Sequence, residues 1–344
     1  LFESGPLRAA TFKFNSGVAA VRLINDLGEV VMLPFQGQQI WKAIMHGRDL
    51  TMRTIFEQPY PTRDFLSTFG GFMLHCGATA IGSPGPLDHH PVHGELPNAP
   101  YETAQIVSGQ DENGTYIGLT GTYRHQMNFN YNYIAQPLVK LYERSSIIHI
   151  SMTITNLRAT PLPFMYMSHI NFRPVDNARL VYSTPCDPQH VKVRASVPGH
   201  MVVKPGYREF IERLKSHPEE HLILKPDLNF DPEIVFYIHY LADENGWGYA
   251  MHVHPDGSAD LVQQRLSQLN HGICWISRMP DQQAIGLEPA TAEVDGFTLE
   301  KEKGNLRLLE QNQQFHCEIR TGALTSEEVE KIEAKIETLL MKHI

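Results

Sequence analysis

The feature that most constrains the fold is a strict alternation of apolar and polar residues. Ile148, Ile150, Met152 and Ile154 alternate with polar side chains, and a period of two is the pattern of a half-buried β-strand. Similar strand patterns occur at residues 164–170, 235–241, 248–254, 284–288 and 314–319. The chain is therefore expected to fold mainly from β-strands.

Two identical turn sequences separate strand segments. Asp-Glu-Asn-Gly occurs at residues 111–114 and again at 243–246, and Asn-Gly favours the positive φ angles of a tight β-hairpin turn. Frequent strands without interleaved helices indicate an all-β antiparallel sandwich. No linker, repeat or low-complexity tract interrupts the 344 residues, so we expect residues 1–344 to form a single domain.

Helices are expected at two places only. Residues 207–216 can form a short helix that Pro218 stops. Thr325 and Glu328 form a capping box near the C-terminus. An apolar stripe at helical spacing follows this capping box and consists of Val329, Ile332, Ile336, Leu339 and Leu340. The C-terminal helix is expected to pack on the outside of the sandwich or to contact a second copy of the chain, as in a homodimer.

Charge and composition exclude several classes of function. The net charge of −9 argues against nucleic acid, because phosphate backbones need clustered Lys and Arg. No stretch approaches the ~20 apolar residues of a membrane span, and the first residues lack the pattern of a signal peptide. We therefore expect a cytoplasmic protein with free thiols. Its four cysteines, which show no C-x-x-C spacing, are Cys76, Cys186, Cys274 and Cys317.

Residues 58–100 have little periodicity and are expected to form a long functional loop. Within it, Asp88, His89, His90 and His93 offer a candidate metal site, since His with carboxylate suits zinc and other divalent ions. Adjacent histidines point apart on an extended chain, however, and solvated loop histidines are the simpler interpretation. We therefore expect that no metal is bound.

Three residues stand out as candidates for proton transfer. Glu288 ends the apolar segment 284–288, where an acid either faces a cleft or pairs with a basic residue. His169 shares a strand face with Met165 and Met167, so it is either a core histidine or a proton donor. His93 lies in the sequence Pro-Val-His-Gly-Glu at residues 91–95.

The order and spacing of these three motifs resemble the galactose mutarotase (aldose 1-epimerase) superfamily, most closely its less characterised bacterial branch. The resemblance implies a β-supersandwich of large antiparallel sheets and no cofactor. It also implies that Glu288 is the general base, that His169 is the general acid and that His93 contacts the sugar near its ring oxygen. Two departures from the family pattern are Ser168, where the family has Asn, and Glu95, where the family has Gly.

The same resemblance suggests residues that bind the sugar hydroxyls. Arg53 and Asp227 correspond to an upstream arginine and a mid-chain aspartate of the family, and His75 stands near the place of an Asn-Arg pair that is absent here. His239 is a further candidate. Trp275 is expected either to stack on a sugar face or to lie in the core.

The reaction that this resemblance implies is the interconversion of the α and β anomers of a free hexose, pentose or deoxy sugar, with neither nucleic acid nor membrane as a partner. His93, His169 and Glu288 should then converge on one concave face, with His169 and Glu288 several ångströms apart. Two alternatives remain open. One is a carbohydrate-binding or sensing protein without turnover, and the other is a metal-dependent sugar isomerase that uses residues 88–93.

Overall fold

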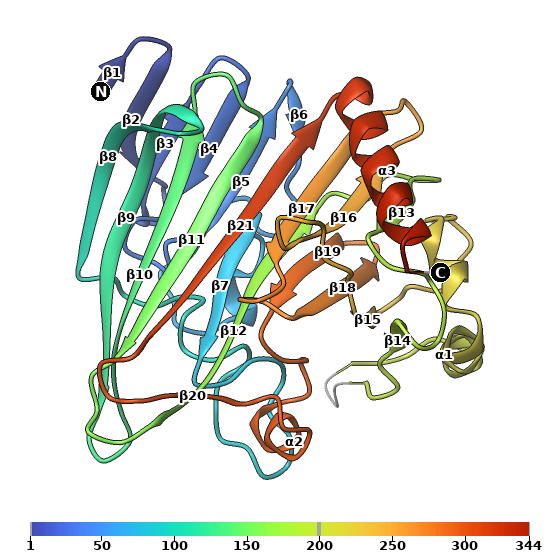
Figure 1. Cartoon of the computed structure of the whole chain (residues 1–344). Coiled ribbons are helices and arrows are strands. Elements are labelled where there is room, and N and C mark those ends of the chain that lie inside the picture. The colour runs from blue at the N-terminus through green and yellow to red at the C-terminus, as the bar shows by residue number, and fades with distance from the viewer. Residues whose placement is uncertain (1, 198–200, 344) are drawn as a thin grey trace.

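The computed structural model describes residues 2–197 and 201–343, whose strands form two large antiparallel sheets packed face to face (Figure 1). The 13-stranded sheet runs in the spatial order β1 (Phe2–Ser4), β2 (Leu7–Lys13), β3 (Ala19–Ile24), β4 (Gly28–Met32), β5 (Ile40–Met45), β7 (Met73–Ala78), β12 (Leu162–Phe172), β19 (Gln283–Ala290), β18 (His271–Arg278), β15 (Ile234–Ile238) and β14 (Val191–Val193), with β6 (Arg48–Asp49) beside β5 and β20 (Arg307–Leu309) beside β12. The 8-stranded sheet has the order β13 (Arg179–Tyr182), β16 (Trp247–Val253), β17 (Ala259–Arg265), β21 (Gln314–Leu324), β11 (Ile147–Asn156), β10 (Tyr131–Tyr142), β9 (Gly114–Met127) and β8 (Thr103–Asp111). The expectation of an all-β sandwich of large antiparallel sheets is confirmed.

The strand predicted from the alternating pattern is β11, and its side chains are alternately buried and partly exposed along its length. The other predicted strands also form, although β15 ends at Ile238 rather than at residue 241. Within the loop predicted for residues 58–100, Met73–Ala78 instead form β7, a buried strand between β5 and β12. Periodicity did not reveal β7 because every one of its residues is buried.

The two Asp-Glu-Asn-Gly turns have different outcomes. Asp111 pairs with Gly114, so the first joins β8 and β9 in the predicted hairpin. In the second, the Gly246 amide donates to the Asp243 carbonyl at 2.9 Å, which closes a tight turn. The hairpin prediction there is wrong, because β15 before the turn and β16 after it lie in different sheets. A turn sequence fixes the local chain reversal but not the partner of each strand.

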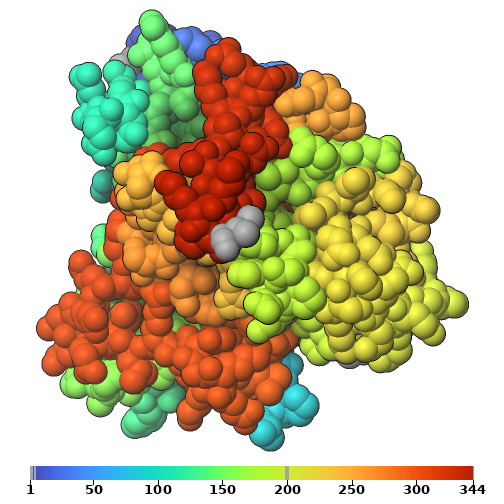
Figure 2. All heavy atoms as spheres, turned by 45° about the vertical axis from the view of Figure 1, so that its right-hand side comes forward, coloured from blue at the N-terminus to red at the C-terminus, as the bar shows by residue number. Residues whose placement is uncertain are grey.

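The predicted helices form α1 (Tyr207–Ser216) and α3 (Ser326–Met341), and α3 begins with the Thr325–Glu328 capping box. A third helix, α2 (Phe297–Glu302), was not predicted, and short 3₁₀ turns lie at η1 (Leu66–Thr68) and η2 (Pro218–Leu222). Figure 2 shows α3 lying over the outside of the molecule beside the lobe that contains α1. Val329 and Ile336 of α3 pack there against β16 and β17. No helix among the described residues is both long and apolar enough to cross a membrane.

Strand β12 separates two apolar layers. Phe164, Tyr166 and Ile170 belong to the main core, which the two sheets enclose. Met165 and Met167 point to the opposite face and join a second core with residues of the segment 65–81. His169 follows the same alternation, so it lies on this outer face, beneath the long connecting segment.

Candidate active site

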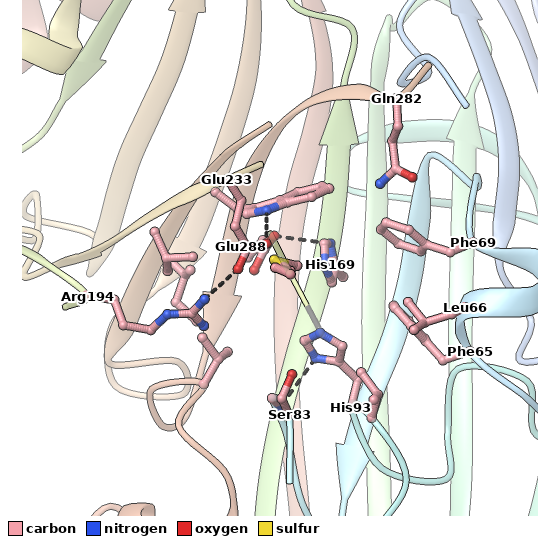
Figure 3. Close-up of a pocket in the computed structure, with 17 residues that line it drawn as sticks. Phe65, Leu66, Phe69, Ser83, His93, His169, Arg194, Glu233, Gln282 and Glu288 are labelled. Atoms are coloured by element: carbon pink, nitrogen blue, oxygen red, sulfur yellow. Dashed lines mark hydrogen bonds and ion pairs between the residues drawn. The ribbon is translucent and has the colours of Figure 1, made fainter. Parts of the chain in front are cut away.

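The three candidates for proton transfer, His93, His169 and Glu288, line one pocket of about 130 Å³ on the outer face of the 13-stranded sheet (Figure 3). His169 lies on β12 and Glu288 on β19, and these strands are antiparallel neighbours. Met167 pairs with Ala290 and Asn171 with Gly286, so the register places His169 directly opposite Glu288. A separation of 119 residues in sequence is therefore bridged by one strand pairing.

The side chains of His169 and Glu288 are in direct contact. Nδ1 of His169 lies 3.1 Å from Oε1 of Glu288, and only 5% and 3% of the two residues are exposed. The expected separation of several ångströms is wrong, because residues facing each other across an antiparallel ladder are held close. The two atoms are not aligned for a hydrogen bond, and each lacks any other protein partner. Two buried polar atoms thus remain available to a ligand.

Gly286 makes room for the Glu288 carboxylate. The two residues point to the same side of β19, because strand side chains alternate. A Cβ atom at position 286 would lie 3.1 Å from Cδ of Glu288, closer still to its Oε1, and 3.0 Å from Cβ of Trp275. The Gly-x-Glu spacing of this strand therefore allows the carboxylate to fold back toward His169.

His93 reaches the pocket from the connecting segment. Its backbone has a φ of 58°, and Gly94 follows with a φ of 79°. A Cβ atom on Gly94 would collide with the carbonyl oxygens of Gly77 and Ala80, which accounts for the glycine after the histidine. The Gly82 amide donates to Nδ1 of His93 at 3.3 Å. In neutral His93 the proton is then on Nε2, which is free to donate to a ligand.

The two departures from the family pattern have structural explanations. Glu95 anchors the His93 segment by accepting hydrogen bonds from the Ala78 amide at 3.2 Å, the Thr79 hydroxyl at 2.7 Å and the Tyr133 hydroxyl. Ser168 neighbours His169 on β12, so its side chain points to the opposite face of the sheet. Neither departure removes a group from the pocket.

One wall of the pocket is aromatic and apolar. Phe65 and Phe69 stack on each other with ring centroids 4.7 Å apart. Phe65 packs on His93 at 4.9 Å and Phe69 on His169 at 5.3 Å. Leu66 extends this wall to the rim and is 52% exposed. The segment predicted as a functional loop thus supplies both His93 and this wall.

The opposite side of the pocket carries an ion pair (Figure 3). Arg194 follows β14 and donates to Oε1 of Glu233 at 2.5 Å. Trp275 donates from its indole N–H to Oε2 of the same carboxylate at 2.7 Å. Trp275 also meets the His169 ring edge to face at 5.5 Å. Trp275 is buried in the second apolar core and also lines the pocket, whereas its stacking on a sugar face stays a prediction.

Burial favours the uncharged forms of the central groups. It raises the pKa of Glu288 well above its usual value, and the nearby Glu233 carboxylate adds to this effect. Burial also lowers the pKa of His169 to about 3 and that of His93 well below its usual range. Burial therefore disfavours a charge on either group, and the arrangement that it favours has the proton on Glu288 rather than on His169.

The other four candidates for sugar binding lie outside the pocket. Arg53 is exposed and lines a separate depression with Trp41 and Asp49. His75 is fully buried on the sandwich side, where its Nδ1 lies 2.7 Å from the Tyr166 hydroxyl. Asp227 and His239 are exposed residues outside the pocket lining.

Residues 88–93 fasten a helix rather than gather around one point. Asp88 accepts hydrogen bonds from the amide and hydroxyl of Thr298 at 3.0 and 2.6 Å. Nε2 of His90 accepts from the Phe297 amide at the start of α2 at 3.3 Å, and His89 is exposed. These contacts hold the segment against the start of α2.

Two other clusters of metal-ligand side chains occur within residues 2–197 and 201–343, and both contain a cation of the protein. Asp260 contacts His252 and His254 at 2.9 and 3.1 Å, and Arg48 donates to its second oxygen at 2.5 Å. The second cluster comprises Glu293, Asp295 and Glu300, which surround the ammonium group of Lys303.

Arg194, Glu233, Gln282 and the aromatic wall were not predicted from the sequence. The sequence could have identified Glu233, because it is an acid directly before the apolar strand β15. Glu288 was identified in the same way, as an acid in the apolar strand β19. Arg194 carried no such signal, since it follows a three-residue strand that has no distinctive pattern.

Comparison with known protein families gives one match, over part of the chain. The family model described as a domain of unknown function, DUF4432, matches residues 15–183, which include His93 and His169 but not Glu288. No curated protein matches the chain.

Several solved structures are similar to this one. A candidate aldose 1-epimerase from Klebsiella pneumoniae superposes with a TM-score of 0.82 at 17% identity, over 97% of this chain and 87% of that one. Galactose mutarotase-like proteins from Clostridium acetobutylicum and Lactobacillus casei give TM-scores of 0.59 and 0.55, both at 12% identity. They cover 93% and 88% of this chain and 99% of their own. At these identities the likeness establishes architecture rather than activity. The chain has the galactose mutarotase-like fold.

Proposed function

We propose that the protein is an aldose 1-epimerase that interconverts the anomers of a free sugar in this pocket. The observation that carries the proposal is the contact between His169 and Glu288, two buried titratable groups 3.1 Å apart whose facing atoms lack hydrogen bonds. An anomeric carbon carries two oxygens, the ring oxygen and the hydroxyl oxygen. Opening the ring moves one proton from the hydroxyl to the ring oxygen, which requires a base and an acid side by side.

Glu288 and His169 can exchange the protons that this reaction requires. Opening begins with the proton on His169 and the charge on Glu288, one transfer away from the neutral arrangement that burial favours. Glu288 takes the proton of the anomeric hydroxyl while His169 protonates the ring oxygen. The aldehyde forms, the C1–C2 bond rotates, and closure on the other face reverses both transfers. The protein is returned to its starting state without a net gain or loss of protons.

The other pocket residues support these transfers. His93 donates from Nε2 to the ring oxygen and stabilises the charge that develops there. Phe65, Phe69 and Trp275 limit the access of water to His169, which strengthens these interactions. Each positioned proton carrier contributes about 10²–10⁴ in rate, which is enough for a reaction that already proceeds slowly in water.

Exchange NMR between the α and β anomeric signals tests the proposal directly on a panel of hexoses, pentoses and deoxy sugars. The wild-type protein should accelerate exchange, and Glu288→Gln should still bind sugar while losing at least nine-tenths of the rate. Glu112→Gln, at an exposed glutamate, is the matched control and should retain full activity. Equal rates for wild type and Glu288→Gln would refute the proposed role of the carboxylate.

The same assay separates the two alternatives. A binding or sensing protein would bind a sugar without accelerating anomer exchange. A metal-dependent isomerase would convert aldose to ketose and lose activity after exhaustive chelation, whereas we expect activity to survive. The contacts of Asp88 and His90 with α2 favour the cofactor-independent reaction.

A further inference from the structure

The charge of the pocket limits the class of substrate. Arg194 and Glu233 neutralise each other at 2.5 Å, and Trp275 occupies the second oxygen of the carboxylate. With the single proton that the proposed reaction requires, the Glu288–His169 pair has no net charge, whichever of the two residues holds the proton. Among the residues described, Arg194 is the only arginine or lysine in the pocket lining. A phosphate or carboxylate on the substrate would therefore have to compete with Glu233 for its cation.

The two walls of the pocket differ in chemistry. Phe65, Leu66 and Phe69 lie on one side of His169, whereas Arg194 and Glu233 lie on the other (Figure 3). The arginine donates and the carboxylate accepts, so together they suit a pair of neighbouring sugar hydroxyls. The aromatic side offers flat apolar surface to carbon atoms instead.

The position of His93 sets the direction of a bound sugar ring. His93, which we assign to the ring oxygen, packs directly on Phe65 with ring centroids 4.9 Å apart. In a pyranose the ring oxygen connects C1 to C5, so C5 and its substituent lie on the side of Phe65 and Phe69. C2 and C3, on the other side of C1, then face Arg194 and Glu233. This direction places the hydroxyl-bearing carbons at the polar wall.

We infer, taking the proposed function as the starting point, that the substrate is a neutral sugar whose C5 carries no hydroxylated substituent, that is, a 6-deoxyhexose or a pentose. A methyl group or hydrogen atom on C5 packs against Phe65, Leu66 and Phe69. The CH₂OH group of an ordinary hexose would instead lose hydrogen bonds to water at this wall. Gln282, which lines the pocket and stands above Phe69 in Figure 3, is then the partner of the C4 hydroxyl.

Sugar pairs that differ only at O6 test this inference: D-fucose with D-galactose, L-rhamnose with L-mannose and 6-deoxy-D-glucose with D-glucose. In the pair that the protein turns over fastest, the deoxy sugar should have a kcat/KM about 10- to 100-fold higher than its parent hexose. This is the range over which an apolar pocket discriminates a single group. Dissociation constants from NMR titration should show the same order. Preference for the parent hexose in every pair, or for a 6-phosphate or a uronate, would overturn the inference.

Two substitutions test which pocket residue discriminates between the deoxy sugar and its parent hexose. Leu66→Gln gives O6 a hydrogen-bonding partner and should reduce the preference for the deoxy sugar at least threefold. Leu308→Gln, at a similarly exposed leucine outside the pocket lining, is the control and should leave the preference unchanged. Gln282→Leu should weaken both members of a pair equally. A selective loss of the parent hexose in Gln282→Leu would place O6 on Gln282 and contradict the assignment.

The binding measurements keep this inference separate from the proposed function. Selective binding of deoxy sugars without acceleration of anomer exchange would refute the epimerase and leave the substrate class standing. Rapid anomer exchange without discrimination at O6 would support the epimerase and refute the inferred substrate class. Absence of binding for every sugar of the panel would overturn the substrate class itself.

Discussion

Gly286→Ala tests whether the position of the Glu288 carboxylate, rather than its presence, sets the rate. A methyl group at residue 286 would meet Oε1 of Glu288, the atom that contacts His169, well inside van der Waals distance. The carboxylate is the end of a flexible side chain, so it can swing away by about 1 Å. A displacement of that size costs roughly 10²-fold in rate. We expect kcat to fall by about this factor.

The stability of the same variant should change much less. Crowding at a packed site costs about 1–3 kcal/mol, and we expect the lower end because the obstructing atoms can move, although Cβ of Trp275 lies at 3.0 Å from the new methyl group. The free energy of unfolding, measured in urea, should therefore fall by about 1 kcal/mol. Glu288→Ala removes the carboxylate. In that variant, Gly286→Ala should therefore lower the free energy of unfolding by at most half as much as it does in the wild-type protein.

Anomer-exchange NMR and urea unfolding of the four proteins in this cycle complete the test. A Gly286→Ala variant that retains more than a tenth of the wild-type kcat would refute a role for the position of the carboxylate. An equal loss in the free energy of unfolding with and without the Glu288 side chain would refute it as well, since the glycine would then act through its backbone.

Four further outcomes are expected. The acid limb of the pH–rate profile should lie well below pH 6.5, because burial lowers the pKa of His169 to about 3; a limb near pH 6.5 would contradict a buried pair. Glu288→Gln should gain stability over wild type as pH rises above about 4.5, since the raised pKa of Glu288 keeps a proton on the folded protein that the unfolded chain releases; thermal melts across pH check this. Asp260→Asn should lower the free energy of unfolding in urea by about 3 kcal/mol at neutral pH, whereas Asp256→Asn, at an exposed neighbour, should leave it almost unchanged. The pairing of Asp260 depresses its pKa, so its stabilising effect should fade below pH 3.8. Glu95→Ala should lower kcat/KM about tenfold by releasing the His93 segment from its hydrogen bonds; an unchanged kcat/KM would show that His93 is held by other contacts.

The sequence was informative where a pattern is local. Period-two alternation located β11, and the capping box located the start of α3. Residue type and order identified His93, His169 and Glu288, which the fold brings into one pocket. These signals depend on a few consecutive residues, so they survive without knowledge of the neighbours.

Features that depend on the pairing of distant segments were not accessible. The direct contact of His169 with Glu288 follows from the β12–β19 register, which no local pattern encodes. The same holds for Arg194 and Glu233, which meet because β14 pairs with β15. The turn at residues 243–246 shows the limit plainly, because its sequence is identical to that of a true hairpin but its flanking strands belong to different sheets.

The position of β21 has a consequence for how this chain acquires its structure. This strand, at residues 314–324, lies between β11 and β17 in the middle of the 8-stranded sheet. Until it is synthesised and inserted, both neighbours present an unpaired edge, which is a template for association with other chains. Contacts between residues so far apart in sequence also form slowly. A nascent chain that has passed the ribosome only as far as residue 300 therefore carries all three residues of the proposed reaction, but it remains prone to aggregation until its last strand closes the sheet.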